Sequence, residues 1–180
     1  MAETRNIRSD DYDMLHELEA EIFGKAGYPL VGSYYLRVCT ELYAESCFVA
    51  LIDGRPVGYV LTFLNDGVAY STRLGVLDEH QGTGAAIQLI AATIDLLVRK
   101  DFDVCWFTVK PGNLHARRLY QRIGAVERGT RRDFFAPGDE LILLELDRAA
   151  LKSFNEKYEL HWGRRANASI GASSGQPVVI

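Results

Sequence analysis

Apolar positions recur at helical spacing near the start of the chain, after a short extended stretch in "TRNIRSDDYD". Leu15, Leu18 and Ile22 follow one another at intervals of three and four residues, which predicts a helix from about residue 10, capped by Ser9 or Asp10. Three glycines and a proline in "GKAGYPLVG" end this pattern, and "SYYLRVCTELYAE" resumes it as a second helix.

Three strand-like runs follow, "SCFVALI", "PVGYVLTFL" and "GVAYSTRLGV". They are separated by Asp53-Gly54 and by Asp66-Gly67, and this dipeptide is typical of tight β-hairpin turns. The pattern therefore predicts an antiparallel meander of three strands.

The second half of the chain alternates between helical and strand-like periodicity. Apolar residues at offsets of 0, 3, 4, 7 and 10 predict an amphipathic helix through Ile87, Ile90, Ala91, Ile94 and Leu97. "DVCWFTV" reads as a strand, "NLHARRLYQRIGA" as a helix, and "GTRRDFF" with "DELILLEL" as a hairpin. The predicted order is βααβββαβαββ, an α+β (mixed α/β) fold with a central, mostly antiparallel, twisted sheet of about seven strands and about four helices.

The chain of 180 residues is long enough for one domain with a full core, because 48% of its residues are hydrophobic. We expect this domain to span residues 1–150. From Leu151 the hydrophobic rhythm weakens and "NASIGASSGQPVVI" is rich in small residues, so residues 151–180 are expected to form a partly mobile C-terminal extension. Trp162 in this extension indicates packing on the domain or on a second subunit of a homodimer.

Composition excludes several classes of protein. A net charge of −4 argues against a general nucleic-acid binder, which needs a basic face to neutralise phosphates. Cys39, Cys47 and Cys105 show no Cys-x-x-Cys spacing, so we expect a reducing compartment and neither a disulfide framework nor a zinc site. "MAETRNIRSDDYD" is polar throughout and the apolar-rich run over residues 85–98 is too short to span a bilayer, so we expect a cytoplasmic protein with no membrane partner.

The stretch "QGTGAAIQLI", residues 81–90, places two glycines and two alanines between a strand and a helix. Unpaired N–H groups and the positive end of the helix dipole make such a helix start a site for an anion, and small residues let a phosphate approach the backbone. A plain strand-to-helix turn is the alternative. The loop lacks the Lys-Ser/Thr of a P-loop and the Gly-x-Gly-x-x-Gly spacing of a dinucleotide-binding loop.

Asn113 and Tyr120 form a second candidate constellation. They are seven residues apart on one predicted helix, almost two turns, and therefore face the same side. The alternative interpretations are that Asn113 caps this helix and that Tyr120 is a core residue.

Loop and helix together resemble the GNAT superfamily of N-acetyltransferases. The family's pyrophosphate loop reads Gln/Arg-x-x-Gly-x-Gly/Ala, and Gln81, Gly84 and Ala86 fit it within "LGVLDEHQGTGAA". The pair Asn113 and Tyr120, followed by "RIGA", matches a later motif of the family. The predicted order of strands and helices over residues 4–147 also agrees with the fold of this family.

The resemblance implies a direct transfer from acetyl-CoA to an amine in a ternary complex, without a metal. Two central parallel strands would splay apart to form the acetyl-CoA cleft, and the pantetheine arm would bond to the backbone of Leu74, Gly75 and Val76. The pyrophosphate would be held by backbone N–H groups of Gln81, Gly82, Thr83, Gly84, Ala85 and Ala86. Asn113 would bond near the pantetheine, and Tyr120 would protonate the departing thiolate.

The attacking amine must be neutral, and the sequence departs from many relatives in how this is achieved. Deprotonating a lysine-like amine with a pKa of about 10.4 costs about 4.6 kcal/mol at pH 7, whereas deprotonating an α-amine with a pKa near 8 costs about 1.4 kcal/mol. The strand "AYSTRLGV" lacks the glutamate that such enzymes often place there. Candidate bases are a chain of water molecules or the side chains of Glu21, Asp78, Glu79, His80 and His115.

The acceptor pocket is expected between "FGKAGYPLVGSYY" and "RRDFFAPGDE". Both segments are aromatic, and the candidate substrate-binding residues are Phe23, Tyr28, Tyr34 and Phe134. Packing in the core or in a lid is the alternative for these side chains and for Tyr35 and Phe135. Arg131 and Arg132 are candidates for binding an acidic group of the acceptor.

Three functions follow from these observations. The first is an acetyl-CoA-dependent N-acetyltransferase that acts on a small-molecule amine. The second is an acetyltransferase of protein N-termini or of lysine side chains, and the third is a non-catalytic acyl-CoA-binding regulatory module. A dinucleotide-binding oxidoreductase is disfavoured by the glycine spacing and by the single βαβ unit.

Overall fold

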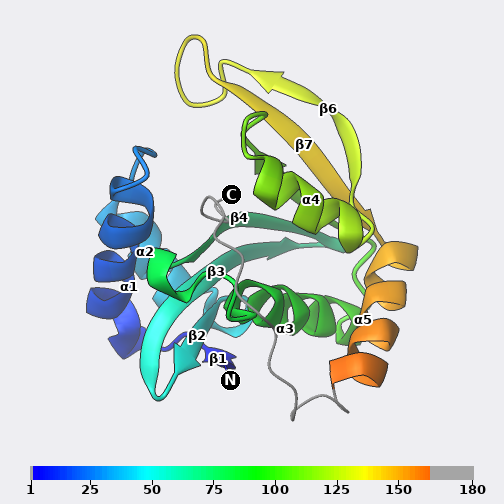
Figure 1. Cartoon of the computed structure of the whole chain (residues 1–180), viewed down its shortest axis with the longest axis horizontal. Coiled ribbons are helices and arrows are strands. Elements are labelled where there is room, and N and C mark those ends of the chain that lie inside the picture. Colours follow the sequence, from blue (N-terminus) through cyan, green and yellow to red (C-terminus); the bar gives the residue numbers. More distant parts are fainter. Residues whose placement is uncertain (1, 163–180) are drawn as a thin grey trace.

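A seven-stranded sheet in the order β1-β2-β3-β4-β5-β7-β6 forms the centre of the molecule (Figure 1). The computed structural model describes residues 2–162, with side chains as far as Tyr158. The strands are β1 (Glu3–Asn6), β2 (Phe48–Ile52), β3 (Arg55–Asn65), β4 (Val68–Val76), β5 (Val104–Val109), β6 (Val126–Arg132) and β7 (Glu140–Asp147). The α-helices are α1 (Tyr12–Glu19), α2 (Ser33–Glu41), α3 (Ala85–Arg99), α4 (Leu114–Arg122) and α5 (Arg148–Trp162).

Helices cover the sheet on both faces and enclose two clusters of buried side chains. On one face α1 and α2 pack through Leu15, Leu18 and Leu36. On the other, α3, α4 and the start of α5 pack over β3, β4 and β5 through residues such as Leu89 and Tyr120. The sheet is therefore buried on both sides where β3 and β4 lie.

The predicted order of elements is confirmed. β2, β3 and β4 form the antiparallel meander, β4 and β5 are the parallel pair joined through α3, and β6 and β7 form the last hairpin. The start of the first helix was misplaced, because a 3-10 turn occupies Ser9–Asp11 and Asp11 is the N-cap of α1.

Residues 2–162 form five α-helices, one more than the sequence pattern predicts. α5 begins at Arg148, where the Asp147 carboxylate accepts a hydrogen bond of 2.8 Å from the N–H of Ala150. Leu151 is buried, and the Tyr158 hydroxyl donates to Gln88 of α3 at 2.6 Å. Residues 163–180, and the side chain of Trp162, lie outside the described part of the chain, so the domain boundary at residue 150, the mobile extension and the homodimer stay predictions.

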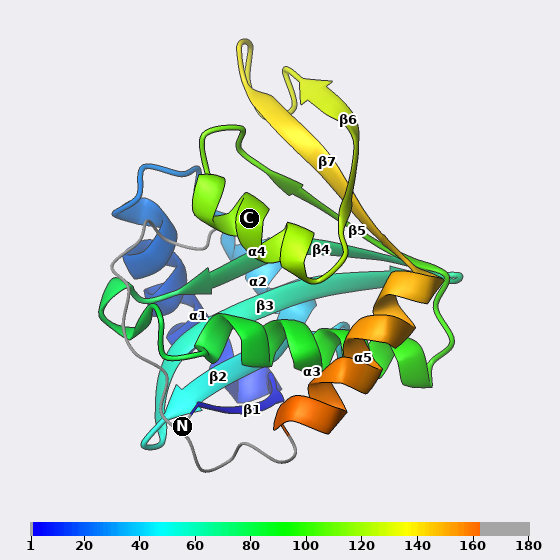
Figure 2. The ribbon, with the colours of Figure 1, turned by 45° about the vertical axis from the view of Figure 1, so that its right-hand side comes forward.

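The parallel pair β4 and β5 separates after four residues. Its register runs from Val68–Val104 to Ser71–Phe107, and β5 then continues to Val109 paired only with β7. The register between β3 and β4 shifts at the same level, which leaves Thr72 as an extra residue in a β-bulge and bends β4. Figure 2 shows the two strands diverging toward their C-terminal ends.

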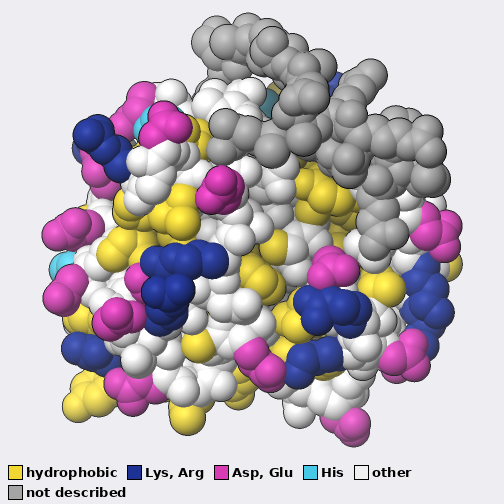
Figure 3. Space-filling model, turned by 90° about the horizontal axis from the view of Figure 1, so that it is seen from below, with side chains coloured by type: hydrophobic (Ala, Val, Ile, Leu, Met, Phe, Trp, Pro, Cys, Tyr) yellow, Lys and Arg dark blue, Asp and Glu magenta, His cyan; other side chains and the backbone are white. Residues whose placement is uncertain are grey.

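Charges of both signs are interspersed on the face of the molecule that Figure 3 shows. No helix within residues 2–162 combines the length and the apolar composition that crossing a membrane requires.

Candidate active site

The loop between β4 and α3 requires its glycines for conformational reasons. Gly82 and Gly84 have φ angles of 78° and 89°, in the left-handed region that residues with a side chain rarely adopt. Gly84 is also the N-cap of α3. A β-branched residue at either position would strain the turn before any question of ligand binding arises.

The same loop leaves backbone donors open. The side chains of Gln81 and Thr83 bond back within the loop, to Asp78 at 2.8 Å and to the His80 carbonyl at 2.6 Å. Within the described part of the chain, the N–H groups of residues 82 and 84–86 have no acceptor. Open donors of this kind, here at the start of the 15-residue helix α3, are groups to which an anion can bind.

The predicted pantetheine contacts lie on the part of β4 that has left β5. Leu74, Gly75 and Val76 pair with β3 on one edge, while no strand within residues 2–162 lies along their other edge. Leu74 and Val76 point into the core beneath α3. Gly75 is required by packing, because a Cβ there would lie 2.9 Å from Cε2 of Phe23. This open backbone edge is the kind of surface to which an extended ligand can add like a strand.

Tyr120 lies at the level where β4 and β5 part. It is 2% exposed, and its ring packs on Phe107 with a centroid distance of 4.3 Å. Its hydroxyl has no hydrogen-bond partner among the described residues. Tyr120 lines a small cavity of about 30 Å³, together with Ser71 and Phe107, the last residues that pair β4 with β5.

Burial determines the protonation state of this hydroxyl. Desolvation, and secondarily Cys105, raise the pKa of Tyr120 well above its ordinary value. Tyr120 is therefore protonated at neutral pH and can donate its proton.

Asn113 has the capping role that was the alternative interpretation. Its Oδ1 accepts a hydrogen bond of 3.0 Å from the N–H of Ala116 at the start of α4. Its side chain also bonds to Tyr28, whose pKa is raised by burial and lowered to a smaller extent by this bond. The Nζ of Lys110 lies 4.0 Å from the centroid of the Tyr28 ring. The loop between α1 and α2 thus reaches the loop between β5 and α4.

The four aromatic candidates for acceptor binding do not form one group. Phe23 is fully buried and packs edge-on with Tyr28 at a centroid distance of 6.1 Å. Tyr34 is 91% exposed, whereas its neighbour Tyr35 points inward and bonds to Thr72 of β4. Phe134 is on the segment between β6 and β7, where its only described ring contact is with Phe135.

A buried ion pair on the acceptor side was missed in the sequence. Glu19 of α1 and Arg73 of β4 are 2% and 6% exposed, and Oε1 of the former lies 2.7 Å from Nη2 of the latter. The Tyr59 hydroxyl donates to the other carboxylate oxygen. One signal was present, because Glu19 falls at i+4 on the apolar face that begins at Leu15.

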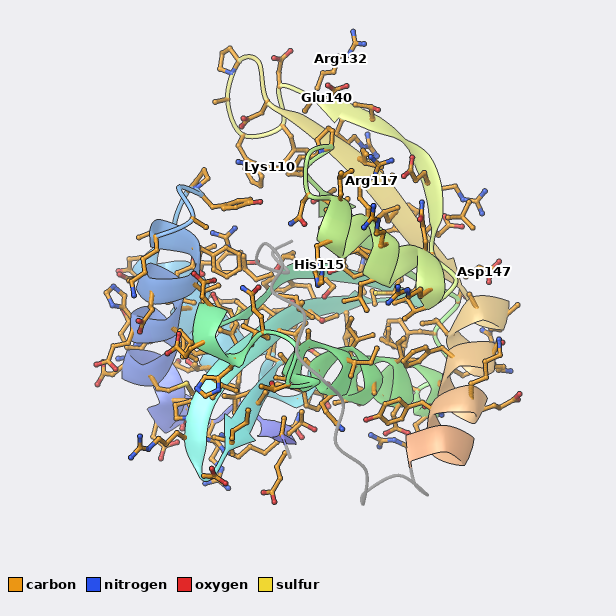
Figure 4. The ribbon with its side chains drawn as sticks, viewed as in Figure 1. Lys110, His115, Arg117, Arg132, Glu140 and Asp147 are labelled. Atoms are coloured by element: carbon orange, nitrogen blue, oxygen red, sulfur yellow. The ribbon has the colours of Figure 1, made fainter. Side chains whose placement is uncertain are left out.

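The candidate bases lie near the surface. Glu21 pairs with Lys25 at 2.7 Å, and Asp78 accepts from Gln81. Glu79 is exposed and His80 half-buried. Figure 4 shows His115 on the side of α4 that faces α3, and Lys110 in the loop before α4.

The two arginines proposed to bind an acidic acceptor group are exposed on β6. Figure 4 shows Arg132 and Glu140 together on the β6–β7 hairpin, while Asp147 lies at the opposite end beside α5. Within residues 2–162, no group of three His, Cys, Asp or Glu side chains is arranged to hold a metal ion.

This combination of an open loop at a helix start, splayed parallel strands and a buried tyrosine characterises a known family. The sequence profile of the acetyltransferase (GNAT) family matches residues 7–125, and the chain belongs to this family. It is therefore an acetyltransferase, as the resemblance implied.

Relatives with named activities include N-acetyltransferases. The chain is 29% identical over 143 residues to the uncharacterised N-acetyltransferase MJ1530 of Methanocaldococcus jannaschii, covering 78% of this chain and 88% of that protein. It is 25% identical over 143 residues to a Bacillus subtilis protein provisionally named a ribosomal protein bS18-alanine N-acetyltransferase, covering 79% and 93%. The ribosomal-protein-S18-alanine N-acetyltransferase of Escherichia coli shares the fold, with a TM-score of 0.69 at 17% identity over 82% of this chain and 94% of that chain.

Proposed function

We propose that the chain transfers the acetyl group of acetyl-CoA directly to an α-amine in a ternary complex. The observation that carries this proposal is the Tyr120 hydroxyl, which is protonated, buried and without a described partner where β4 and β5 separate. A buried polar group left unpaired costs about 1–3 kcal/mol, so its retention calls for a functional reason.

The residues present fit acetyl-CoA, which supplies an activated acetyl group as a thioester. The open N–H groups of residues 82 and 84–86 suit its pyrophosphate, and the free edge of Leu74 to Val76 suits its pantetheine. Asn113 borders the same opening through its bond to Tyr28.

Tyr120 then acts as the general acid. The cavity that it lines is walled mainly by apolar side chains, among them Leu74, Ile90 and Phe107. Such surroundings disfavour any anion, so they raise the proton affinity of a released thiolate together with that of the phenol, and the two groups stay matched for proton transfer although burial has raised the pKa of Tyr120.

The acceptor is proposed to be an α-amine rather than a lysine side chain. Among the described side chains Glu19 is the only buried carboxylate, and its oxygens accept hydrogen bonds from Arg73, Tyr59 and the N–H of Val31. Three donors therefore already occupy the oxygens that would have to receive the proton of an amine. An α-amine needs a base far less, because its deprotonation at pH 7 costs about 1.4 kcal/mol, whereas that of a lysine side chain costs about 4.6 kcal/mol.

We place a peptide N-terminus first among α-amines. Its support is the naming of relatives, the Bacillus subtilis protein above and an N-alpha-acetyltransferase of Saccharolobus solfataricus, 22% identical over 154 residues. A small-molecule amine, not restricted to an α-amine, is the second candidate, supported by an L-2,4-diaminobutyric acid acetyltransferase of Halalkalibacterium halodurans, 29% identical over 92 residues. This reverses the order suggested by the sequence alone.

Two measurements test the proposal. Calorimetric titration with acetyl-CoA and with desulfo-coenzyme A is expected to show binding of both. Desulfo-coenzyme A lacks the sulfur atom but keeps the pyrophosphate and the rest of the pantetheine, which are the parts expected to bind. Thiol release is then followed with three acceptors. The first is a peptide with a free N-terminus and no lysine, the second is a peptide with a blocked N-terminus and one internal lysine, and the third is a set of free amino acids. We expect turnover with the first and little with the second. Binding without any turnover would support the regulatory module instead.

A further inference from the structure

We infer that the buried pair Glu19 and Arg73 is a positioning device for the acceptor side. The pair holds the α1–α2 loop, residues 25–32, so that Tyr28 spans the opening between β4 and β5. This inference rests on the proposed function in one respect only, namely that the opening is where acetyl transfer takes place.

The two charges are held by more than their mutual attraction. The guanidinium of Arg73 lies 4.1 Å from the centroid of the Phe23 ring, and the Tyr59 hydroxyl donates to Glu19. The β-bulge at Thr72 explains how Arg73 reaches this place, because Thr72 and Arg73 are consecutive yet both contact the α1–α2 side of the sheet.

Each charge also bonds to the backbone of the loop. Oε1 of Glu19 accepts a hydrogen bond of 2.8 Å from the N–H of Val31, and Nη2 of Arg73 donates to the carbonyl of Pro29. Leu30, between these anchors, is 54% exposed and adds little burial. Besides the partly buried side chain of Val31, which packs against the core under α1 and α2, the ion pair therefore attaches this end of the loop.

Tyr28 immediately precedes the anchored residues. It touches Phe23, which lies over Gly75 of β4, and on its other side it meets Lys110 and Asn113, which follow β5. Its ring therefore bridges the open ends of the two diverging strands. An amine that approaches the opening from the acceptor side has to pass beside this ring.

Stability alone does not account for the ion pair. Buried pairs are often matched or exceeded in stability by apolar residues of similar volume, whereas they specify one arrangement of the groups around them. Here the arrangement specified is the path of the loop, since both charges bond to it.

Two variants test this inference in the full-length chain. The double variant Glu19→Leu/Arg73→Met removes both anchors and replaces the pair with apolar groups. Val31→Pro leaves both charges in place and removes the N–H that bonds to Glu19; it also replaces the Val31 side chain, which packs partly buried against the core under α1 and α2. The exposed pair Arg99 and Asp95 on α3 supplies the control, Asp95→Ala/Arg99→Ala.

Hydrogen exchange and acceptor kinetics give independent results. Both variants are expected to speed amide exchange over residues 25–32 and to raise the acceptor KM about tenfold or more, with a smaller change in kcat and in the Kd of acetyl-CoA. Glu19→Gln keeps a carbonyl acceptor for the N–H of Val31 and should therefore exchange more slowly over this loop than the double variant does. The control should change none of these quantities.

The inference and the proposed function fail in different ways. If Val31→Pro folds and leaves both the loop exchange and the acceptor KM unchanged, the positioning role is overturned. If the double variant exchanges slowly in this loop, the role is overturned as well. If the natural sequence acetylates no amine, the proposed function fails, while the exchange measurement still decides whether the pair holds the loop.

Discussion

Replacing Tyr120 by phenylalanine removes one hydroxyl from a place where it has no described partner. No hydrogen bond to a described residue is lost, and the desolvation cost of an unpaired buried polar group, about 1–3 kcal/mol, disappears. We therefore expect the free energy of unfolding to stay level or to rise by about 1 kcal/mol, which for a chain of this size moves Tm up by about 2–4 °C. Calorimetric or circular-dichroism melting measures this change.

The same substitution is expected to slow acetyl transfer. Loss of a general acid costs about 10²–10⁴-fold in rate, or roughly 3–5 kcal/mol in the activation barrier. The measurement is kcat by thiol release at saturating acetyl-CoA and saturating peptide. A gain in stability with a loss of turnover is the combination expected of a residue kept for function.

Tyr59→Phe is the matched control, because Tyr59 is also fully buried but its hydroxyl donates to the Glu19 carboxylate. Removing a hydrogen bond to a charged group should cost about 1.5–3 kcal/mol of stability. Most of kcat should remain, since Tyr59 lies on the other face of the sheet from Tyr120. If Tyr120→Phe destabilises the protein as Tyr59→Phe does, or leaves turnover unchanged, the assignment of Tyr120 as the acid is refuted.

Three further results are expected. Gly84→Val should raise the Kd of acetyl-CoA far more than Gly54→Val, although both glycines have positive φ angles of 89° and 74° and both variants should lose about 1–2 kcal/mol of stability. If titration gives the two variants the same Kd for acetyl-CoA, the loop is an ordinary strand-to-helix turn with no role in binding. Burial raises the pKa values of Tyr59 and Tyr120, so the unfolded chain releases their protons first and stability should fall above about pH 10, by about 1.4 kcal/mol per pH unit for each tyrosine. Urea unfolding between pH 9 and 11 should show a shallower fall in Tyr120→Phe, and an unchanged slope would contradict the burial of this hydroxyl. With a peptide acceptor, kcat/KM should rise with pH and level off above about pH 9, one unit beyond the α-amine pKa of about 8, and a rise that continues toward pH 10 would indicate a lysine acceptor.

Local features of the fold were predictable because their causes are local. Asp53-Gly54 and Asp66-Gly67 form the expected hairpin turns, with positive φ angles at all four residues. Asn113 caps α4 through a bond to an N–H three residues on. α5 was missed although Leu151, Phe154 and Tyr158 recur at helical spacing, because the small residues after residue 163 dominated the interpretation of the whole extension.

The candidate site likewise has features with local causes and features that depend on contacts between distant parts of the chain. The positions of Gly82, Gly84 and Tyr120 were determined by the sequence alone, because turn geometry and helix periodicity act over a few residues. The tertiary structure decided where β4 leaves β5 and that the Tyr120 hydroxyl is buried there without a hydrogen-bond partner among the described residues. It also decided that a carboxylate from α1 meets an arginine from β4, 54 residues away. Such contacts depend on strand register and on the packing of distant elements, which no local pattern of residues encodes.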